Sequence, residues 1–372
     1  SRNMNVLIDW IASKGGYVHP QLKLAPFPDS GVGAFVDGTK GKSGLAVGEL
    51  LVRVPAACIL FADEESTNGF GLNSDGSRGA FDSGALKQMV LALALHTERT
   101  KGADSEFAPY IDTLPKSLQS FPVLWPTEEQ DVLCASSELA RGQIAAQTLQ
   151  LRREHAHLEH CGAKLGLTMS FEDYCTAKLL VSSRCFGIGG KGDVAMLPLI
   201  DMPNHSAKPH VSLGRISPAV VPASKSTTSP EKPPPPPQSQ NTMEPADGRR
   251  AADGGSGSQS NGSGGDGFTL TVVRHVNERE QLYSSYDRDQ TRPAVSWLLN
   301  YGFVPDGTDT QNAPSSQEAA ELDDLPQNIS EASERSLRAI QQLETFGPHT
   351  HGAIRLLKIE RAACLRECDV GS

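Results

Sequence analysis

The chain has 372 residues, a formal net charge of −10 at pH 7 and 38% hydrophobic residues. At roughly 100–200 residues per domain, this length allows two or three packed units with a sizeable core. The acidic balance disfavours binding to nucleic-acid phosphates, so we expect a basic protein or a neutral small molecule as partner and no nucleic acid. No apolar run approaches the roughly 20 residues of a membrane-spanning helix, so we expect no membrane partner.

Residues 1–83 are expected to be rich in short strands, because short β-type runs alternate here with turns. The run that ends at Pro55 is typical of a strand that proline stops. The glycines Gly31 and Gly33 follow Pro28, Asp29 and Ser30 in what reads as a loop. Glycine in such a loop lets the backbone approach a ligand closely.

Three helices are predicted between residues 85 and 182. Apolar residues take helical spacing from residue 85 to about Glu98. A second helix is expected over about residues 137–161, where Gly162 stops it, and a third over about residues 171–182, with Ser170 as its N-cap. Residues 84–170 are therefore predicted to be a helical insertion within a β-rich domain.

Residues 197–206 are predicted to contain a buried strand that runs into a polar pair, Asn204 and His205. We expect a small polar ligand there, although such a pair taken alone is more often a turn. The glycine-rich run from Gly187 to Gly192 lacks the strand-to-helix context and the Lys-Ser/Thr ending of a phosphate loop, so we interpret it as a hairpin turn.

Residues from about 217 to 267 differ in composition from the rest of the chain. Five consecutive prolines, from Pro233 to Pro237, are followed by runs of glycine and serine. This segment cannot bury enough apolar surface to offset its ordering entropy, so we expect disorder with local polyproline II structure. We interpret it as a loop inserted into one domain, because the segments on either side supply parts of one predicted site.

A tyrosine-rich segment follows the strand-like run that starts at Phe268. It contains Tyr283 and Tyr286, and a second aromatic run extends from Trp297 to Phe303 with Tyr301 within it. Two further helices are predicted at about residues 330–346 and 353–366, with apolar faces suited to docking against another element.

The chain contains seven cysteines and no CxxC pair. An odd number without a paired pattern fits reduced thiols better than a disulfide framework, so we expect an intracellular soluble protein; chloroplast, cytoplasm and nucleus stay open. Cys364 and Cys368 lie one helical turn apart, but two ligands do not make a zinc site, so no metal is expected.

Taken together, these motifs resemble the SET-domain protein methyltransferases of the plant Rubisco large-subunit lysine methyltransferase class. The resemblance rests on the Gly31 to Ala34 stretch, the Asn204-His205 pair, the two tyrosines and the run from Ala108 to Pro115. It implies an α+β fold, namely a β-rich SET domain of short strands with a helical insertion and a short, truncated C-terminal helical segment. It assigns residues 1–83 and 171–305 to the SET domain, 84–170 to the insertion and 306–372 to a reduced substrate-binding-like region.

The resemblance also implies S-adenosylmethionine as methyl donor and a protein lysine side chain as acceptor. Tyr286 matches the tyrosine at the methyl-transfer pore and Tyr301 the second tyrosine beside it. The positions that match the donor site are Ser30, Gly31, Val32, Arg184, Asp201, Asn204 and His205. The sequence departs from the family pattern at Ser30, where an acidic residue is usual, and at Arg292-Pro293, which replace a Ser-Asn pair.

The chemistry is compatible with these residue types. Methyl transfer from a sulfonium is an in-line displacement, so the protein must mainly align donor and acceptor. A lysine ammonium cannot attack, so the site must favour the neutral amine, and tyrosine hydroxyls can orient it.

Three functions therefore stay open. The first is methylation of lysine on a non-histone protein, and the second is methylation of histidine at the same donor site. The third is a catalytically inactive SET-like interaction module, in which the prolines from Pro233 to Pro237 bind a proline-reading domain.

Overall fold

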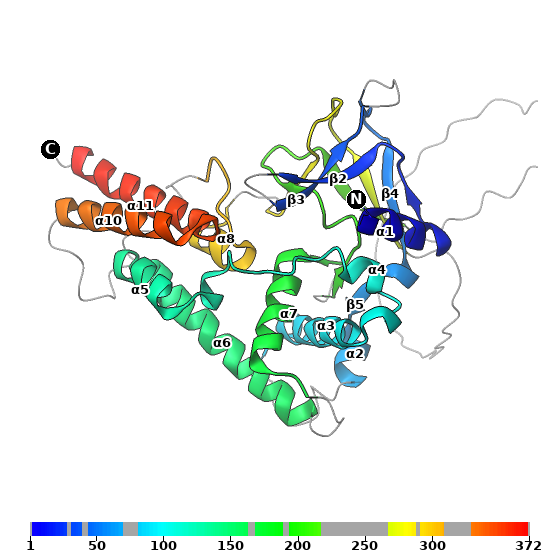
Figure 1. Cartoon of the computed structure of the whole chain (residues 1–372), viewed down its shortest axis with the longest axis horizontal. Helices are drawn as coiled ribbons and strands as arrows, with labels where there is room; N and C mark the ends of the chain where they lie inside the picture. Colours follow the sequence, from blue (N-terminus) through cyan, green and yellow to red (C-terminus); the bar gives the residue numbers. More distant parts are fainter. Residues whose placement is uncertain are drawn as a thin grey trace, which may run out of the picture.

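The structure is a computed structural model of the chain, and it describes residues 2–27, 31–38, 44–69, 81–162, 168–188, 193–216, 267–287, 291–308 and 329–370. Helices and short strands combine in an α+β fold, as predicted. Figure 1 shows β2, β3 and β4 together on one side, α10 and α11 on the other, and α8 near the centre. Ser30 and the prolines from Pro233 to Pro237 lie outside the described residues.

The four-stranded sheet has the order β1-β4-β10-β9, and all its neighbours pair antiparallel. Its strands are β1 (Tyr17–Val18), β4 (Leu50–Pro55), β9 (Val211–Ile216) and β10 (Gly267–Val272). Gly267 pairs with Ile216, so the residues on either side of 217–266 lie opposite each other on adjacent strands. Gly267, which we had assigned to the disordered segment, belongs to β10.

Three smaller sheets are also present among the described residues, and two of them are a hairpin and a three-stranded sheet. The hairpin of β2 (Leu22–Phe27) and β3 (Gly31–Val36) contains the stretch that we interpreted as a loop. That prediction was wrong for Gly31 to Gly33, since these residues pair across the hairpin. The three-stranded sheet has the order β5-β7-β6, with β5 (Leu60–Ala62), β6 (Cys185–Gly187) and β7 (Val194–Met196).

The strand predicted from residue 197 is also wrong in its position. The strand ends at Met196, and residues 198–201 form a tight buried turn in which Leu199 has a φ of +65°. Asn204 and His205 then form a strand of their own, β8 (Asn204–His205). A run of apolar residues does not reveal a turn when the turn itself is buried.

The helix α1 (Arg2–Ser13) was not predicted, since residues 1–83 were expected to be short strands and turns. Met4, Leu7 and Ile11 lie three and four residues apart and are buried in the main core. The first turn of α1 has no acidic residue, and polar residues separate its apolar positions, so the helical period is easily overlooked in a short stretch.

Nine described helices remain, of which the four over residues 64–69, 108–111, 127–136 and 294–301 were not predicted and the other five match predicted ranges. They are α2 (Glu64–Gly69), α3 (Ser83–Thr100), α4 (Ala108–Ile111), α5 (Thr127–Ser136), α6 (Glu138–Gly162), α7 (Phe171–Arg184), α8 (Ala294–Tyr301), α10 (Ile329–Phe346) and α11 (His351–Val370). The predicted N-cap is confirmed, because the Ser170 hydroxyl accepts a hydrogen bond from the backbone N–H of Asp173 at 3.1 Å.

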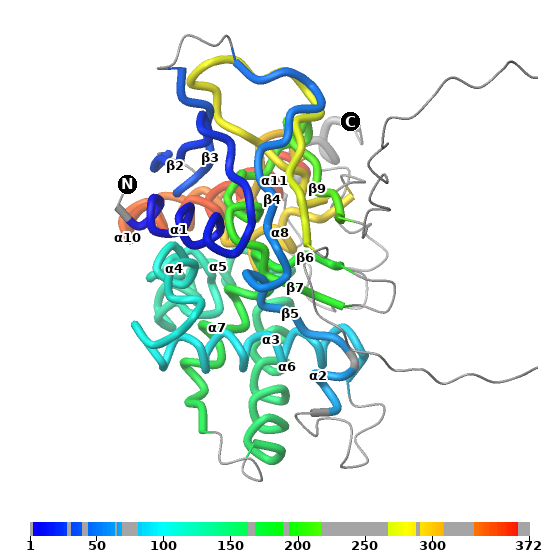
Figure 2. Tube along the Cα trace, turned by 90° about the vertical axis from the view of Figure 1, so that its right-hand side faces the viewer, coloured from blue at the N-terminus to red at the C-terminus, as the bar shows by residue number. Residues whose placement is uncertain are grey.

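The buried residues form two hydrophobic clusters. The larger one joins the sheets to α1, α3 and α7, whereas the smaller one joins α5, α6 and α8 to the C-terminal helices α10 and α11. Figure 2 shows α2, α3 and α6 beneath the strands. Among the described helices, none is both long and apolar enough to cross a membrane.

Candidate functional site

The predicted site is assembled by two short strands that are far apart in the chain. β8 pairs in parallel with β11 (Tyr283–Ser284), with Asn204 opposite Tyr283 and His205 opposite Ser284. The backbone N–H of Ser206 adds a 3.0 Å hydrogen bond to the Ser284 carbonyl. This pairing brings the Asn-His pair and the tyrosine segment together across residues 217–266.

His205 holds the backbone next to β11. Its Nδ1 accepts a 3.1 Å hydrogen bond from the backbone N–H of Tyr286, so the neutral ring carries its proton on Nε2. Burial lowers the pKa of His205 to about 4; Asp287 opposes this shift and the positive charge of Arg292 adds to it. His205 is therefore neutral at pH 7.

Tyr286 is fixed through its hydroxyl as well as its backbone. The hydroxyl donates a 2.9 Å hydrogen bond to the Pro203 carbonyl. Burial raises the pKa of Tyr286, against the opposing charge of Arg184, so the phenol stays protonated. Its ring lies 5.4 Å from the ring of His205 and 5.2 Å from the ring of Tyr301.

The helix α8 supplies the second half of an aromatic cluster, which we define as His205, Tyr286, Trp297, Tyr301 and Phe303. Trp297 and Tyr301 share one face of α8 because they are four residues apart, and their ring centroids are 5.0 Å apart. Trp297 also lies 4.4 Å from the ring of His205.

Gly302, in the left-handed conformation, ends α8, and a Cβ there would lie 2.3 Å from the hydroxyl oxygen of Ser120. This position therefore needs glycine for its space as well as for its backbone conformation.

A buried ionic pair lies in the same part of the fold. Nη1 of Arg184 contacts both the backbone carbonyl oxygen and Oδ2 of Asp201 at 3.2 Å, and the Tyr110 hydroxyl donates to Oδ2 at 2.8 Å. The Asp201 side chain is fully buried, and its Oδ1 has no hydrogen-bond partner among the described residues. Burial raises the pKa of Asp201, whereas Arg184 and Tyr110 oppose that shift.

The strand β3 passes directly against Asn204. A Cβ on Gly33 would lie 2.6 Å from Nδ2 of Asn204 and 2.7 Å from Nε2 of Gln281, so a side chain at this position would have to displace these two amide groups. Gln281 Nε2 is buried and has no hydrogen-bond partner within the described ranges. Gly31 and Val32, the predicted donor contacts, are exposed at the start of β3.

Sequence reasoning did not include four residues that lie in this region. Tyr110 was quoted only as part of a family signature, and Trp297 only as part of an aromatic run. Arg292 was noted only as a departure from the family pattern, and Gln281 carried no sequence signal. The four-residue spacing of Trp297 and Tyr301 was the signal that could have identified Trp297.

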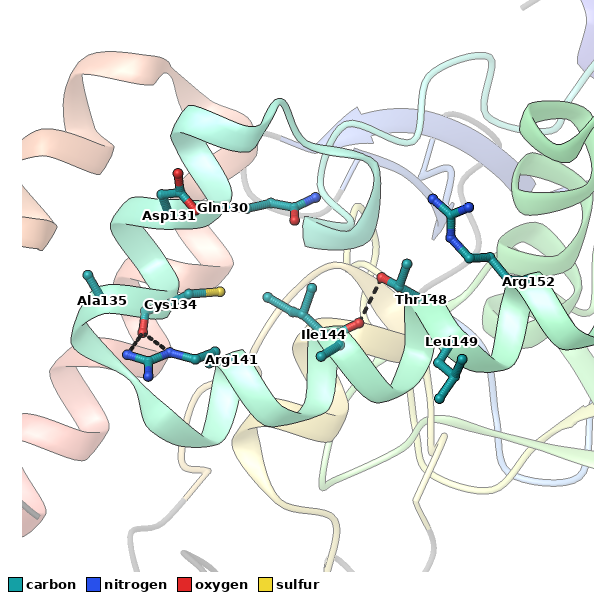
Figure 3. A pocket seen from close by; sticks show the side chains of 10 residues that line it. Gln130, Asp131, Cys134, Ala135, Arg141, Ile144, Thr148, Leu149 and Arg152 are labelled. Atoms are coloured by element: carbon teal, nitrogen blue, oxygen red, sulfur yellow. Dashed lines mark hydrogen bonds between the residues drawn. The ribbon is translucent and has the colours of Figure 1, made fainter. Parts of the chain in front are cut away.

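A separate hollow of about 720 Å³ opens between α5 and α6 (Figure 3). Its lining includes Cys134, Ile144, Leu149 and Arg152, and it contains none of the predicted site residues that the structure describes. In the described parts of the chain, no group of three or more His, Cys, Asp or Glu side chains is arranged to hold a metal ion.

Comparison with known proteins shows the fold. No family model matches the chain. An uncharacterized protein of Schizosaccharomyces pombe is 24% identical over 226 residues, which are 55% of this chain and 44% of that protein. The chain thus aligns with less than half of that relative.

Two solved structures align over most of the chain. The SET domain of LSMT bound to lysine and AdoHcy aligns with a TM-score of 0.55 and 16% identity over 82% of this chain and 57% of that one. Rubisco LSMT bound to AdoMet aligns with a TM-score of 0.53 and 13% identity over 99% of this chain and 92% of that one. The chain has the SET-domain fold of Rubisco LSMT.

Proposed function

We propose that the protein is an S-adenosylmethionine-dependent lysine N-methyltransferase that acts on a non-histone protein. The observation that carries this proposal is the parallel pairing of β8 with β11, which joins His205 and Tyr286 to the rings of α8 in one cluster. The structural counterparts of this fold are described as bound to lysine and to AdoMet or AdoHcy, which supports the same pair of ligands here.

The donor site in this proposal consists of Asn204, His205, Arg184, Asp201 and the backbone from Ser30 to Val32. The chemistry of the described groups fits a ligand with an amino-acid end and an adenine. Asp201 Oδ1 and Gln281 Nε2 are a buried acceptor and a buried donor without partners among the described residues, and such groups usually have one.

The acceptor site in this proposal lies at Tyr286 and Tyr301. Burial raises the pKa of both phenols, so neither is a base at pH 7. The Tyr286 hydroxyl donates its proton to the Pro203 carbonyl, which leaves its oxygen lone pairs to accept a hydrogen bond from an amine. The tyrosines thus orient the amine, and the amine loses its proton to solvent before it reacts.

When bound, the donor supplies a methyl group on a positively charged sulfur. The amine lone pair forms the new N–C bond as the S–C bond breaks, and the bonding electrons leave with the sulfur as a neutral thioether. The part of this chain is alignment, exclusion of water and stabilisation of the neutral amine.

The first test is calorimetric titration of S-adenosylmethionine into the wild type and into the Asn204→Ala, His205→Ala double variant. We expect micromolar-range binding that the double variant loses. Transfer of labelled methyl groups to lysate proteins, followed by hydrolysis and amino-acid analysis, then separates methyllysine from methylhistidine. Absence of donor binding to the folded wild type overturns the proposal and favours the interaction module.

In the proposed division of the chain, residues 84–170 are an insertion that contributes to both hydrophobic clusters, and residues 306–372 are a reduced C-terminal region. The C-terminal helices α10 and α11 pack in the smaller cluster together with α5 and α8. In this arrangement they support the helix that carries Trp297 and Tyr301, which gives the C-terminal region a structural role beside substrate binding.

A further inference from the structure

Arg292 places a positive charge on the aromatic cluster. It lies two residues before α8, and its guanidinium carbon is 5.4 Å from the ring centroid of Trp297 and 5.3 Å from that of Tyr301. Both distances are within the range of a cation–π interaction. The Arg292 guanidinium therefore contacts both rings that α8 contributes to the cluster, those of Trp297 and Tyr301.

Arg292 has no direct ionic partner among the described residues, although the Asp287 carboxylate acts on the same neighbouring groups with the opposite sign. In the described part of the chain, no carboxylate forms an ion pair with its guanidinium, and its buried Nε has no hydrogen-bond acceptor. The backbone N–H of Arg292 donates a 2.7 Å hydrogen bond to Oδ2 of Asp287, which holds the start of the segment in place. The aromatic faces are thus the main favourable contacts of the guanidinium.

The charge of Arg292 affects the pKa values of two residues in the proposed catalytic site, His205 and Tyr301. It contributes to the lowered pKa of His205 and opposes the rise in the pKa of Tyr301, whereas the negative charge of Asp287 acts in the opposite direction on both groups. Tyr301 is in turn 5.2 Å from Tyr286, ring to ring. A second cation that binds at these tyrosines meets a fixed positive charge at close range.

We propose that Arg292 is a specificity-determining residue that excludes cationic side chains from the aromatic cluster, so that the site accepts the neutral amine and releases a methylated, cationic product. This inference rests on the proposed function. At separations near 6 Å and an intermediate effective dielectric, repulsion between two unit charges weakens binding of the second one by about tenfold or more.

Substitutions separate the charge of Arg292 from its shape. Arg292→Gln keeps a planar polar group and removes the charge, whereas Arg292→Lys keeps the charge and loses the planar group. Arg152→Gln is the matched control, because Arg152 makes a 5.2 Å cation–π contact with Phe171, away from the cluster. Circular dichroism and thermal unfolding first establish that each variant folds.

The decisive measurement is the affinity of each protein for the free amino acid Nε-trimethyllysine. It is measured by NMR titration, with and without AdoHcy. We expect Arg292→Gln to bind it about tenfold more tightly than the wild type, and Arg292→Lys and Arg152→Gln to stay within about twofold of the wild type. Three outcomes overturn the inference. The first is an equal affinity of Arg292→Gln and wild type for trimethyllysine, and the second is an equal gain in that affinity in Arg292→Gln and Arg292→Lys. The third is no saturable binding of trimethyllysine to any variant.

Calorimetry with AdoHcy on the same four proteins distinguishes failure of this inference from failure of the proposed function. If all four proteins bind AdoHcy but do not differ in trimethyllysine affinity, the inferred role of Arg292 is overturned and the proposed function is not. If no folded protein binds AdoHcy, the proposed methyltransferase function fails, and the titration without AdoHcy still decides whether Arg292 repels a cation.

Discussion

The backbone N–H of Tyr286 donates a hydrogen bond to Nδ1 of His205 over 3.1 Å, although 81 residues separate them in the chain. The bond sets the tautomer of the imidazole and positions the backbone of the tyrosine at once. Any change at His205 therefore reaches the proposed acceptor site as well as the proposed donor site.

Replacement of His205 should show this double role. His205→Ala removes the acceptor for the Tyr286 N–H, so we expect at least a tenfold loss of S-adenosylmethionine affinity and a loss of stability of about 1–3 kcal/mol. His205→Asn can place a side-chain oxygen near the position of Nδ1 and should retain more of both. Calorimetry and chemical unfolding measure the two effects, with His160→Ala on the exposed face of α6 as control.

The lowered pKa of His205, about 4, predicts a dependence of stability on pH. The folded state favours the neutral ring, so this contribution is present above the unfolded pKa of roughly 6.5 and declines as the pH falls towards 4. Between pH 7.5 and 4.5 we expect the wild type to lose about 1–2 kcal/mol more unfolding free energy than His205→Asn. Equal pH profiles of the two proteins contradict the prediction.

Glu360 should have the opposite pH dependence. Burial raises the pKa of Glu360 to about 7, and Ser137 donates a 2.9 Å hydrogen bond to it and opposes that shift. The folded state favours the protonated acid, so its contribution is full below the unfolded pKa and is lost as the pH rises through about 7. Glu360→Gln should therefore be more stable than the wild type at pH 8 by about 1 kcal/mol and similar at pH 4.5. Unfolding of Glu344→Gln, on the exposed side of α10, controls for net charge.

Glu154 should be essential for the packing of α6 on α7. Its side chain is fully buried; it accepts a 2.5 Å hydrogen bond from the Tyr174 hydroxyl and lies 3.6 Å from Nζ of Lys178. Glu154→Ala leaves a buried ammonium without its partner, so we expect a loss of about 3–5 kcal/mol in unfolding free energy. Tyr174→Phe removes only one hydrogen bond and should cost about 1–2 kcal/mol. Similar losses for the two variants argue against a charge effect.

Gly33 and Gly31 should respond differently to alanine. At Gly33 the added methyl group meets the amide of Asn204 at 2.6 Å, so Gly33→Ala should shift Asn204 and weaken S-adenosylmethionine binding by about tenfold or more. At Gly31 nothing lies within 4 Å, but its φ is +69°, so Gly31→Ala should mainly reduce stability, by about 1 kcal/mol. Calorimetry of both variants tests the contrast, and equal donor affinities contradict it.

Local patterns predicted five of the ten described helices, namely α3, α6, α7, α10 and α11. The predicted start near residue 85 corresponds to α3, which begins at Ser83 behind an Asp82 cap, and Ser170 caps α7 as expected. These features depend on residues three or four positions apart, so a sequence displays them directly. The same criterion missed α1, because its residues had been read as part of a stretch of β-type runs.

The sequence by itself determined the α+β class, five of the ten described helices and the residue types of the candidate site, because these follow from local periodicity and chemistry. Only the tertiary structure decided that β8 lies beside β11, that Gly33 faces Asn204 and that Arg292 covers the rings of Trp297 and Tyr301. Such relationships depend on how distant segments pack. Strand pairs of two residues and a guanidinium held mainly by aromatic faces leave no periodic pattern in the chain.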